Sequence, residues 1–194
     1  MALDPFACAI FVIAAFVVSG IAQTLWLKSK LSQRFAAPLD GGRRFRGQRI
    51  FGDNKTPRGF IVIVPATAFA FLGLYQLLAA LRPVWLEGLW VLDRLQFFAL
   101  GAVASLGFML GEIPNSFLKR QLGVPPGGVP RGRVARLACF AVDRLDSVLG
   151  MLLAMSLVVP TPWRMWWFVL LMGPGIHLLF STLLFSLGVK RRWA

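Results

Sequence analysis

Two carboxylates spaced three positions apart give the first indication of chemistry in this chain. Asp143 and Asp146 lie in the segment D-R-L-D-S, in a sequence with only 8 Asp and Glu against 21 Lys and Arg. On a helix the two acids share a face, and Ser147 joins them four positions after Asp143. Carboxylate and hydroxyl oxygens are donors that suit Mg²⁺. The spacing therefore predicts a magnesium site. A simpler interpretation also stands, because acids in the first turn of a helix favour its dipole without binding anything.

A second candidate face lies a little earlier, in the segment E-I-P-N-S-F-L-K-R. Glu112, Ser116 and Lys119 follow the spacing i, i+4, i+7, which places them on one side of a helix. Glu112 ends one apolar segment, and Asp143 precedes the next. Acids at the ends of apolar segments are costly unless they bind something. We hypothesise that the two acidic faces meet, although the sequence does not show which helix faces pack.

A third set of candidates lies in a polar loop over residues 28–58, which holds nine Lys and Arg. Its central part reads P-L-D-G-G-R-R-F-R-G-Q-R-I-F-G-D-N-K-T-P-R-G. Glycines allow the backbone to approach a ligand closely, and a basic, glycine-rich loop carrying Lys55 and Thr56 can cradle phosphates. The Walker pattern is absent. The alternative is a basic loop that only orients the protein in a membrane.

The elements that must position these residues are apolar helices. Hydrophobic residues make up 57% of the 194 residues, and the mean hydropathy is +0.70. We predict an all-α integral membrane protein that forms a single domain over residues 1–194. About 20 apolar residues cross a bilayer as a helix, and five spans are expected, over residues 6–27, 60–81, 95–117, 145–159 and 163–187. Gly101, Gly107 and Gly111 suit close packing of the third span against its neighbours.

The basic residues predict the orientation of these spans. Eighteen lie in the loop over 28–58, in a second polar loop over 118–143, at Arg144 and in the C-terminal tail, whereas only Arg82, Arg94 and Arg164 fall on the other side. The positive-inside rule then places the N-terminus outside and both loops and the C-terminus in the cytoplasm. We expect a multi-pass protein of the plasma (inner) membrane whose active site faces the cytoplasm.

Other classes of function fit less well. The basic residues flank apolar segments, so lipid head groups and substrate phosphates are nearer partners than nucleic acid, which we do not expect as a ligand. Two lone cysteines, Cys8 and Cys139, indicate neither a disulfide framework nor a zinc site. His177 is the only histidine, and a role in helix packing is favoured over catalysis. No G-x-S-x-G motif is present, which argues against a serine hydrolase.

These motifs also resemble known enzymes. D-R-L-D-S-V-L-G, preceded by S-F-L-K-R-x-L-G, is similar to the signature of CTP-dependent phosphatidate cytidylyltransferases, the CDP-diacylglycerol synthases. The first loop, and the segment H-L-L-F-S-T-L-L-F-S-L-G-V-K from His177, more closely resemble the CDP-archaeol synthase family. The resemblance covers roughly residues 20–192. It departs at Glu112, where archaeal relatives commonly have Asp, and at Ser181, where Asn is expected. The Lys-Asp and His-Gly-Gly elements of the phosphatidate enzymes are missing from 121–142, which argues against that activity.

The resemblance implies a set of site residues. The nucleotide site would include Asp53, Lys55, Thr56 and Arg58, with Ser116, Lys119 and Arg120 from the middle motif. Glu112, Asp143 and Asp146 would be the ligands of Mg²⁺. The catalytic residues would be Lys55, Lys119, Arg120, Asp143 and Asp146.

The implied function is transfer of CMP from CTP to a membrane lipid phosphate, with the bilayer as the further partner. The sequence leaves a homodimer undecided. Three alternatives remain. One is a phosphatidate cytidylyltransferase acting on ester lipids, and another is a non-enzymatic membrane protein that binds anionic lipid. A CDP-alcohol phosphotransferase is the third, but Asp40 and Gly41 only begin its D-G-x-x-A-R pattern.

Overall fold

A computed structural model describes residues 3–188, apart from the side chain of His177. Five α-helices form most of this part of the chain: α1 (Pro5–Lys28), α2 (Pro57–Leu81), α3 (Arg94–Gln121), α4 (Arg133–Ser156) and α5 (Trp163–Ser186). Two short 3-10 helices span Leu31–Phe35 and Pro83–Gly88. The strands β1 (Arg44–Phe45) and β2 (Gln48–Arg49) form an antiparallel hairpin, in which Arg44 pairs with Arg49. The predicted all-α class is confirmed apart from this small hairpin.

Local sequence signals explain where the helices begin. The backbone N–H of Phe6 donates to the side chain of Asp4 at 2.9 Å, and Pro5 occupies the first helical position of α1. Asp93 and Gln96 form a reciprocal capping box at the start of α3. Pro57 begins α2 in the same way that Pro5 begins α1. The Asp4 and Asp93 caps provide partners for backbone N–H groups that the helix itself leaves free, whereas α2 begins at its proline without a side-chain cap.

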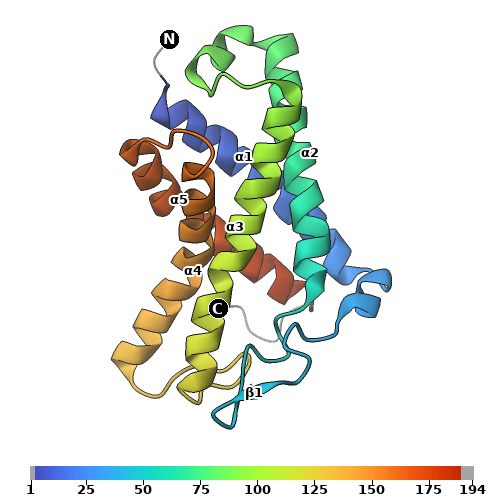
Figure 1. Cartoon of the computed structure of the whole chain (residues 1–194), viewed down its shortest axis with the longest axis vertical. Helices are drawn as coiled ribbons and strands as arrows, with labels where there is room; N and C mark the ends of the chain where they lie inside the picture. Colours follow the sequence, from blue (N-terminus) through green and yellow to red (C-terminus); the bar gives the residue numbers. More distant parts are fainter. Residues whose placement is uncertain (1–2, 189–194) are drawn as a thin grey trace.

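Helix α3 lies at the centre of the bundle, between α2 and α4, and α1 and α5 cross these three helices obliquely (Figure 1). Its small residues permit the close contacts, as predicted. A Cβ on Gly101 would lie 2.7 Å from the carbonyl oxygen of Thr67 on α2, and one on Gly107 would lie 2.5 Å from the carbonyl oxygen of Gly150 on α4. Side chains at these positions would push the helices apart.

Four helices of the described chain are long and apolar enough to cross a membrane: α1, α2, α3 and α5. Helix α4, which includes the span predicted over 145–159, is not among them. Any stretch of α4 long enough for a span contains Asp143, Arg144 and Asp146, and these charges lower its hydropathy. Five spans were expected, and four helices of the described chain meet the length and hydropathy of a span. The predicted cytoplasmic C-terminus falls on residues 189–194, outside the described part. The packing role expected of His177 depends on its side chain, which also lies outside the described part.

The predicted second polar loop is much shorter in the structure. Helix α3 continues to Gln121, and α4 begins at Arg133, so only residues 122–132 connect them. Asp143 is therefore the eleventh residue of α4, and the interpretation that the acids only favour an N-terminal helix dipole is wrong. The connection 122–132 and the hairpin loop lie at the same end of the bundle (Figure 1). They touch there, since a Cβ on Gly52 would lie 2.7 Å from the side chain of Pro126.

Candidate active site

The close contact between α3 and α4 places the two acidic faces against each other. A Cβ on Gly111 would lie 2.3 Å from the backbone oxygen of Asp146, and one on Gly150 would lie 2.7 Å from the Cα of Gly111. The residue after Gly111 is Glu112, and it consequently reaches α4 directly. Ser147 Oγ donates to Glu112 Oε1 at 2.9 Å. The hypothesis that the two acidic faces meet is confirmed.

The first loop supplies a cation to this junction. Lys55 Nζ forms an ion pair with Glu112 Oε2, although the two residues are 57 positions apart in the sequence. Both side chains are about three-quarters buried, at 22% and 24% exposed. About two turns further along α3, Lys119 Nζ forms an ion pair with Asp143 Oδ1. Two lysines from different segments therefore lie among the three carboxylates.

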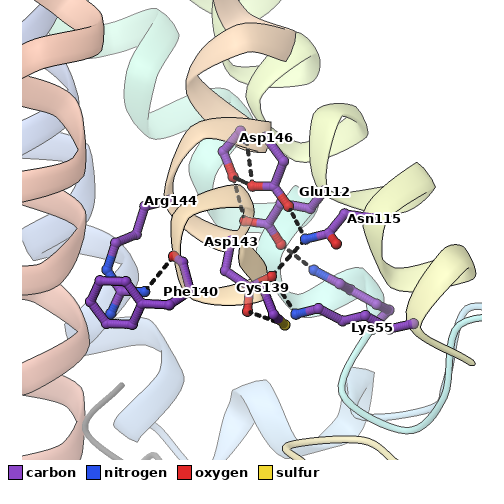
Figure 2. Close-up of polar contacts among 10 residues, drawn as sticks. Lys55, Glu112, Asn115, Cys139, Phe140, Asp143, Arg144 and Asp146 are labelled. Atoms are coloured by element: carbon purple, nitrogen blue, oxygen red, sulfur yellow. Dashed lines mark hydrogen bonds and ion pairs between the residues drawn. The ribbon is translucent and has the colours of Figure 1, made fainter. Parts of the chain in front are cut away.

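Asn115 connects the two aspartates, a role that the sequence analysis missed. Its Nδ2 donates to Asp143 Oδ1 and to Asp146 Oδ2, each at 2.6 Å (Figure 2). A carboxylate oxygen from each acid thus converges on one nitrogen atom. The signal was present, since Asn115 is i+3 from Glu112 and therefore lies on the same helix face. Because the amide is neutral, neither acidic motif singles it out as a site residue.

Arg120 lies just behind this cluster, where the two loops meet. The residue is 8% exposed, and its Nε and Nη1 atoms are buried with no hydrogen-bond partner among the described residues. A Cβ on Gly52 would lie 3.5 Å from Arg120 Cδ, which places the side chain beneath the first loop. A guanidinium stays charged in proteins, and a buried charge without a partner is unfavourable. The arrangement leaves donors available for an anion at this position.

Asp40 organises the first loop itself. Its side chain is fully buried and accepts hydrogen bonds from the backbone N–H groups of Gly42, Phe51 and Gly52 at 2.9–3.0 Å. Arg49 forms an ion pair with it at 2.7 Å. This guanidinium, helped by the three amides and opposed by burial, holds the pKa of the Asp40 carboxyl well below its ordinary range. Asp40 in turn raises the pKa of Arg49.

Three residues predicted for the nucleotide site lie outside the ion-pair cluster. The Asp53 side chain is 68% exposed and pairs with Arg49 at 2.8 Å. Thr56 is buried immediately before α2, and its Oγ1 accepts a hydrogen bond from Arg58 Nε at 3.4 Å. The backbone oxygen of Arg58 accepts a hydrogen bond from Trp26 Nε1 at 3.1 Å. These contacts hold the base of the first loop against α1 and α2. Ser116, the remaining predicted residue, is buried on α3 next to Asn115.

Arg144, between the two aspartates in sequence, points away from them. Its guanidinium lies 3.3 Å from the centroid of the Phe140 ring, and Nη1 donates to the Phe140 oxygen at 2.9 Å. Figure 2 shows this pair on the opposite side of α4 from Lys55 and Asn115. Arg144 therefore contributes to a different face of the helix from the acidic cluster.

The predicted magnesium ligands do not form a ready-made cage. Within residues 3–188, no three His, Cys, Asp or Glu side chains are gathered closely enough to hold a metal ion between them. The donors nevertheless fit Mg²⁺, which proteins commonly hold through one or two carboxylates together with substrate phosphates. Asp143 and Asp146 supply such a pair, because their oxygens converge on one amide nitrogen. All of these donors are oxygens, which Mg²⁺ prefers.

The fold and the site together define a class of protein: a membrane-type helical bundle with a mixed cluster of acids and bases at the end where its polar loops meet. Comparison with known proteins makes this more specific. The family model of CarS-like CDP-archaeol synthases matches residues 29–194. The chain therefore belongs to the CDP-archaeol synthase family, as its motifs suggested.

Individual relatives agree with this assignment. The chain is 38% identical over 162 residues to the CDP-archaeol synthase of Halobacterium salinarum, covering 79% of this chain and 81% of the relative. It is 31% identical over 179 residues to the CDP-archaeol synthase of Methanospirillum hungatei, covering 85% of this chain and 98% of the relative. A third, from Methanocaldococcus jannaschii, is 29% identical over 164 residues, with 80% and 82% covered. No solved structure matches the chain significantly.

Proposed function

We propose that this protein transfers CMP from CTP to a membrane lipid phosphate, which gives a CDP-lipid and pyrophosphate. The observation that carries the proposal is the position of Lys55, Lys119 and Arg120. These three cations gather beside paired carboxylates at the junction of the two polar loops. Membership of the CDP-archaeol synthase family supports an archaeol-type lipid as the acceptor.

The reaction needs little covalent chemistry from the protein. An oxygen of the lipid phosphate attacks the α-phosphorus of CTP, the bond from that phosphorus to the bridging oxygen breaks, and pyrophosphate leaves. The second pKa of a phosphate monoester is about 6, so the nucleophile is already anionic near neutral pH. No general base is required. Catalysis then consists of positioning the two phosphates and neutralising their charge.

The side chains have separable roles in this scheme. Arg120 binds the triphosphate with the donors that are unpartnered in its buried position. Lys55 and Lys119, which pair with Glu112 and Asp143, provide further positive charge next to the reacting phosphates. Mg²⁺, held by Asp143 and Asp146 with Glu112 nearby, would screen the negative charge of the phosphate oxygens. Asn115 keeps the two aspartates together.

The membrane location explains why this site lies at one end of the bundle. We place the loops at 28–56 and 122–132 on the cytoplasmic side of the plasma membrane, where the positive-inside rule puts their basic residues. The N-terminus then lies outside. A charged reaction proceeds at the membrane surface, while the lipid tails stay in the bilayer beside α3 and α4.

The test uses purified protein with CTP, Mg²⁺ and a panel of lipid phosphates that includes ether-linked and ester-linked acceptors. We expect a CDP-lipid and an equal amount of pyrophosphate. Preference for the ether-linked acceptor supports a CDP-archaeol synthase, and preference for the ester-linked one supports the phosphatidate enzyme. Absence of product with every lipid would overturn the proposal and leave a non-enzymatic membrane protein.

A further inference from the structure

The first loop forms an open hollow that the proposed phosphate chemistry does not use. Its volume is about 390 Å³, and it is lined by Leu39, Asp40, Gly41, Arg43, Ile50 and Phe51. Small-molecule sites in proteins have volumes of roughly 300–1,000 Å³. The hollow is therefore large enough for a nucleoside.

The shape of this hollow is fixed by the buried Asp40 side chain. Three backbone amides and Arg49 bond to this carboxylate. These bonds hold the chain at Asp40 against residues 49–52, on the two sides of the hollow. Both oxygens of Asp40 already accept at least two hydrogen bonds. The carboxylate therefore shapes the wall, and recognition of a ligand falls to other side chains.

The remaining walls differ from the rest of the loop in their chemistry. Leu39, Ile50 and Phe51 are apolar and only partly covered, within a segment rich in arginine. Apolar side chains around a cavity, one of them a flat aromatic ring, suit the faces of a planar heterocycle. Stacking of a base on an aromatic ring contributes about 1–3 kcal/mol and does not distinguish one base from another.

Two short connections link this hollow to the phosphate-binding cations. The backbone N–H of Leu39 donates to the oxygen of Lys55 at 2.8 Å, and the Lys55 side chain reaches Glu112. On the other wall, Phe51 precedes Gly52, which lies against Arg120. A ligand that extends out of the hollow therefore meets the cluster that the proposed function assigns to the triphosphate.

Arg43 is the residue that can read a base in this position. It is one of the residues that line the hollow, it is exposed, and its side chain has no hydrogen bond or ion pair with another described residue. Two parallel N–H donors of a guanidinium match two adjacent acceptors. The O2 and N3 atoms of cytosine are adjacent acceptors, whereas N3 of uracil carries a hydrogen and repels the second donor.

We propose that this hollow is the nucleoside subsite, with the pyrimidine against Phe51 and its O2 and N3 edge on Arg43. The inference rests on the proposed function and adds the element that selects cytosine. It assigns base recognition to the hollow and triphosphate binding to Lys55, Lys119 and Arg120. The two parts of the nucleotide site can therefore be tested with different ligands.

The experiment measures equilibrium binding of CTP, UTP and inorganic tripolyphosphate to the full chain and to three variants. In Arg43→Ala, CTP affinity should fall about tenfold, the scale of one lost bidentate contact to a base. UTP and tripolyphosphate affinities should stay within twofold of the original values. In Phe51→Leu, CTP and UTP should weaken together while tripolyphosphate is unchanged. Arg44→Ala, which removes the same charge next to the hollow, should leave the CTP-to-UTP ratio unaltered.

An unchanged CTP-to-UTP ratio in Arg43→Ala would overturn the subsite. The same conclusion follows if Phe51→Leu weakens tripolyphosphate as much as CTP. Either result leaves the proposed function standing, provided that the unmodified protein still makes CDP-lipid. If the unmodified protein binds tripolyphosphate and all nucleotides equally and makes no product, both the subsite and the proposed function fail.

Discussion

Gly150 of α4 packs against Gly111 of α3 with no space between them for a side chain. A Cβ on Gly150 would lie 2.7 Å from Gly111 Cα and 2.3 Å from the oxygen of Gly107. This contact fixes the level at which Glu112 meets Ser147, and hence the geometry of the whole cluster. It is a backbone contact, so no side-chain rotation can relieve the clash.

Gly150→Ala should therefore destabilise the protein, although Ala normally stabilises a helix relative to Gly by up to about 1 kcal/mol. Overpacking of a close contact costs about 1–3 kcal/mol. We expect a lower thermal unfolding midpoint and reduced CDP-lipid formation. The control is Gly73→Ala in α2, where nothing lies within 4 Å of the new methyl group and the midpoint should hold or rise. Equal midpoints for the two variants would contradict the tight contact.

Lys55→Ala should lower the rate of CDP-lipid formation by about 100-fold or more, the effect of removing one preorganised charge from a reacting centre. It also removes the cation paired with Glu112. A second variant separates these effects: Lys55→Ala combined with Glu112→Gln no longer leaves a carboxylate without its lysine. If the double variant regains thermal stability and stays inactive while Glu112→Gln alone keeps measurable turnover, Lys55 acts in the chemistry. Lys30→Ala changes an exposed lysine within the same loop and should keep full activity. Recovery of activity in the double variant would show that the role of Lys55 is structural.

Helix periodicity accounts for the part of the site that the sequence predicts well. The spacings between Asp143 and Asp146, and between Glu112 and Lys119, place each set on one face wherever the helix lies in the bundle. The structure adds that α4 packs against α3 at Gly107 and Gly111, a pairing that the sequence alone did not show. The motif pair could be recognised without knowledge of the tertiary fold.

The features that were missed depend on tertiary contacts or on weak local signals. Asp40 is important because amides eleven and twelve positions later fold back onto it, and no local pattern indicates this. The start of α4 at Arg133 was missed because the charges in residues 133–143 suggested a loop. That segment has no proline or glycine after Gly132, so it can continue the helix that positions Asp143. The span count changed for the same reason, since these charges belong to α4.

Asp143→Asn should reduce turnover by at least about 100-fold, because it removes negative charge where Mg²⁺ and the phosphates are proposed to meet. The amide keeps the size of the side chain and retains an oxygen that can accept from Asn115, so the thermal midpoint should change little. Binding of Mn²⁺ as a paramagnetic substitute, measured in the presence of CTP, should weaken in the variant. Chelation of divalent ions should likewise stop turnover in the unmodified protein.

The matched control for Asp143→Asn is Glu87→Gln, which removes a charge from an exposed residue of the short helix Pro83–Gly88. It should retain Mn²⁺ binding and activity. Normal Mn²⁺ binding and normal turnover in Asp143→Asn would refute the assignment of this carboxylate to the metal.

Asp40 gives the first loop a predictable dependence on pH. The folded-state pKa of its carboxyl is depressed, so its pairing stabilises the loop above the ordinary Asp pKa of about 3.9. That contribution decreases as the pH falls below this value and is lost at the lower, folded-state pKa. Hydrogen exchange of peptides containing Phe51 and Gly52, corrected for the intrinsic rate at each pH, should therefore show constant protection from neutral pH down to about pH 5.

Asp40→Asn should abolish much of this protection at neutral pH, because hydrogen bonds to a charged group contribute about 1.5–3 kcal/mol. The hollow around Arg43 should loosen as a result, and CTP binding should weaken more than tripolyphosphate binding. Asp53→Asn provides the control, since Asp53 pairs with the same Arg49 but is exposed. It should leave the exchange of Phe51 and Gly52 almost unchanged. Equal loss of protection in both variants would show that Arg49, with either acid, maintains the loop and that buried Asp40 has no special role.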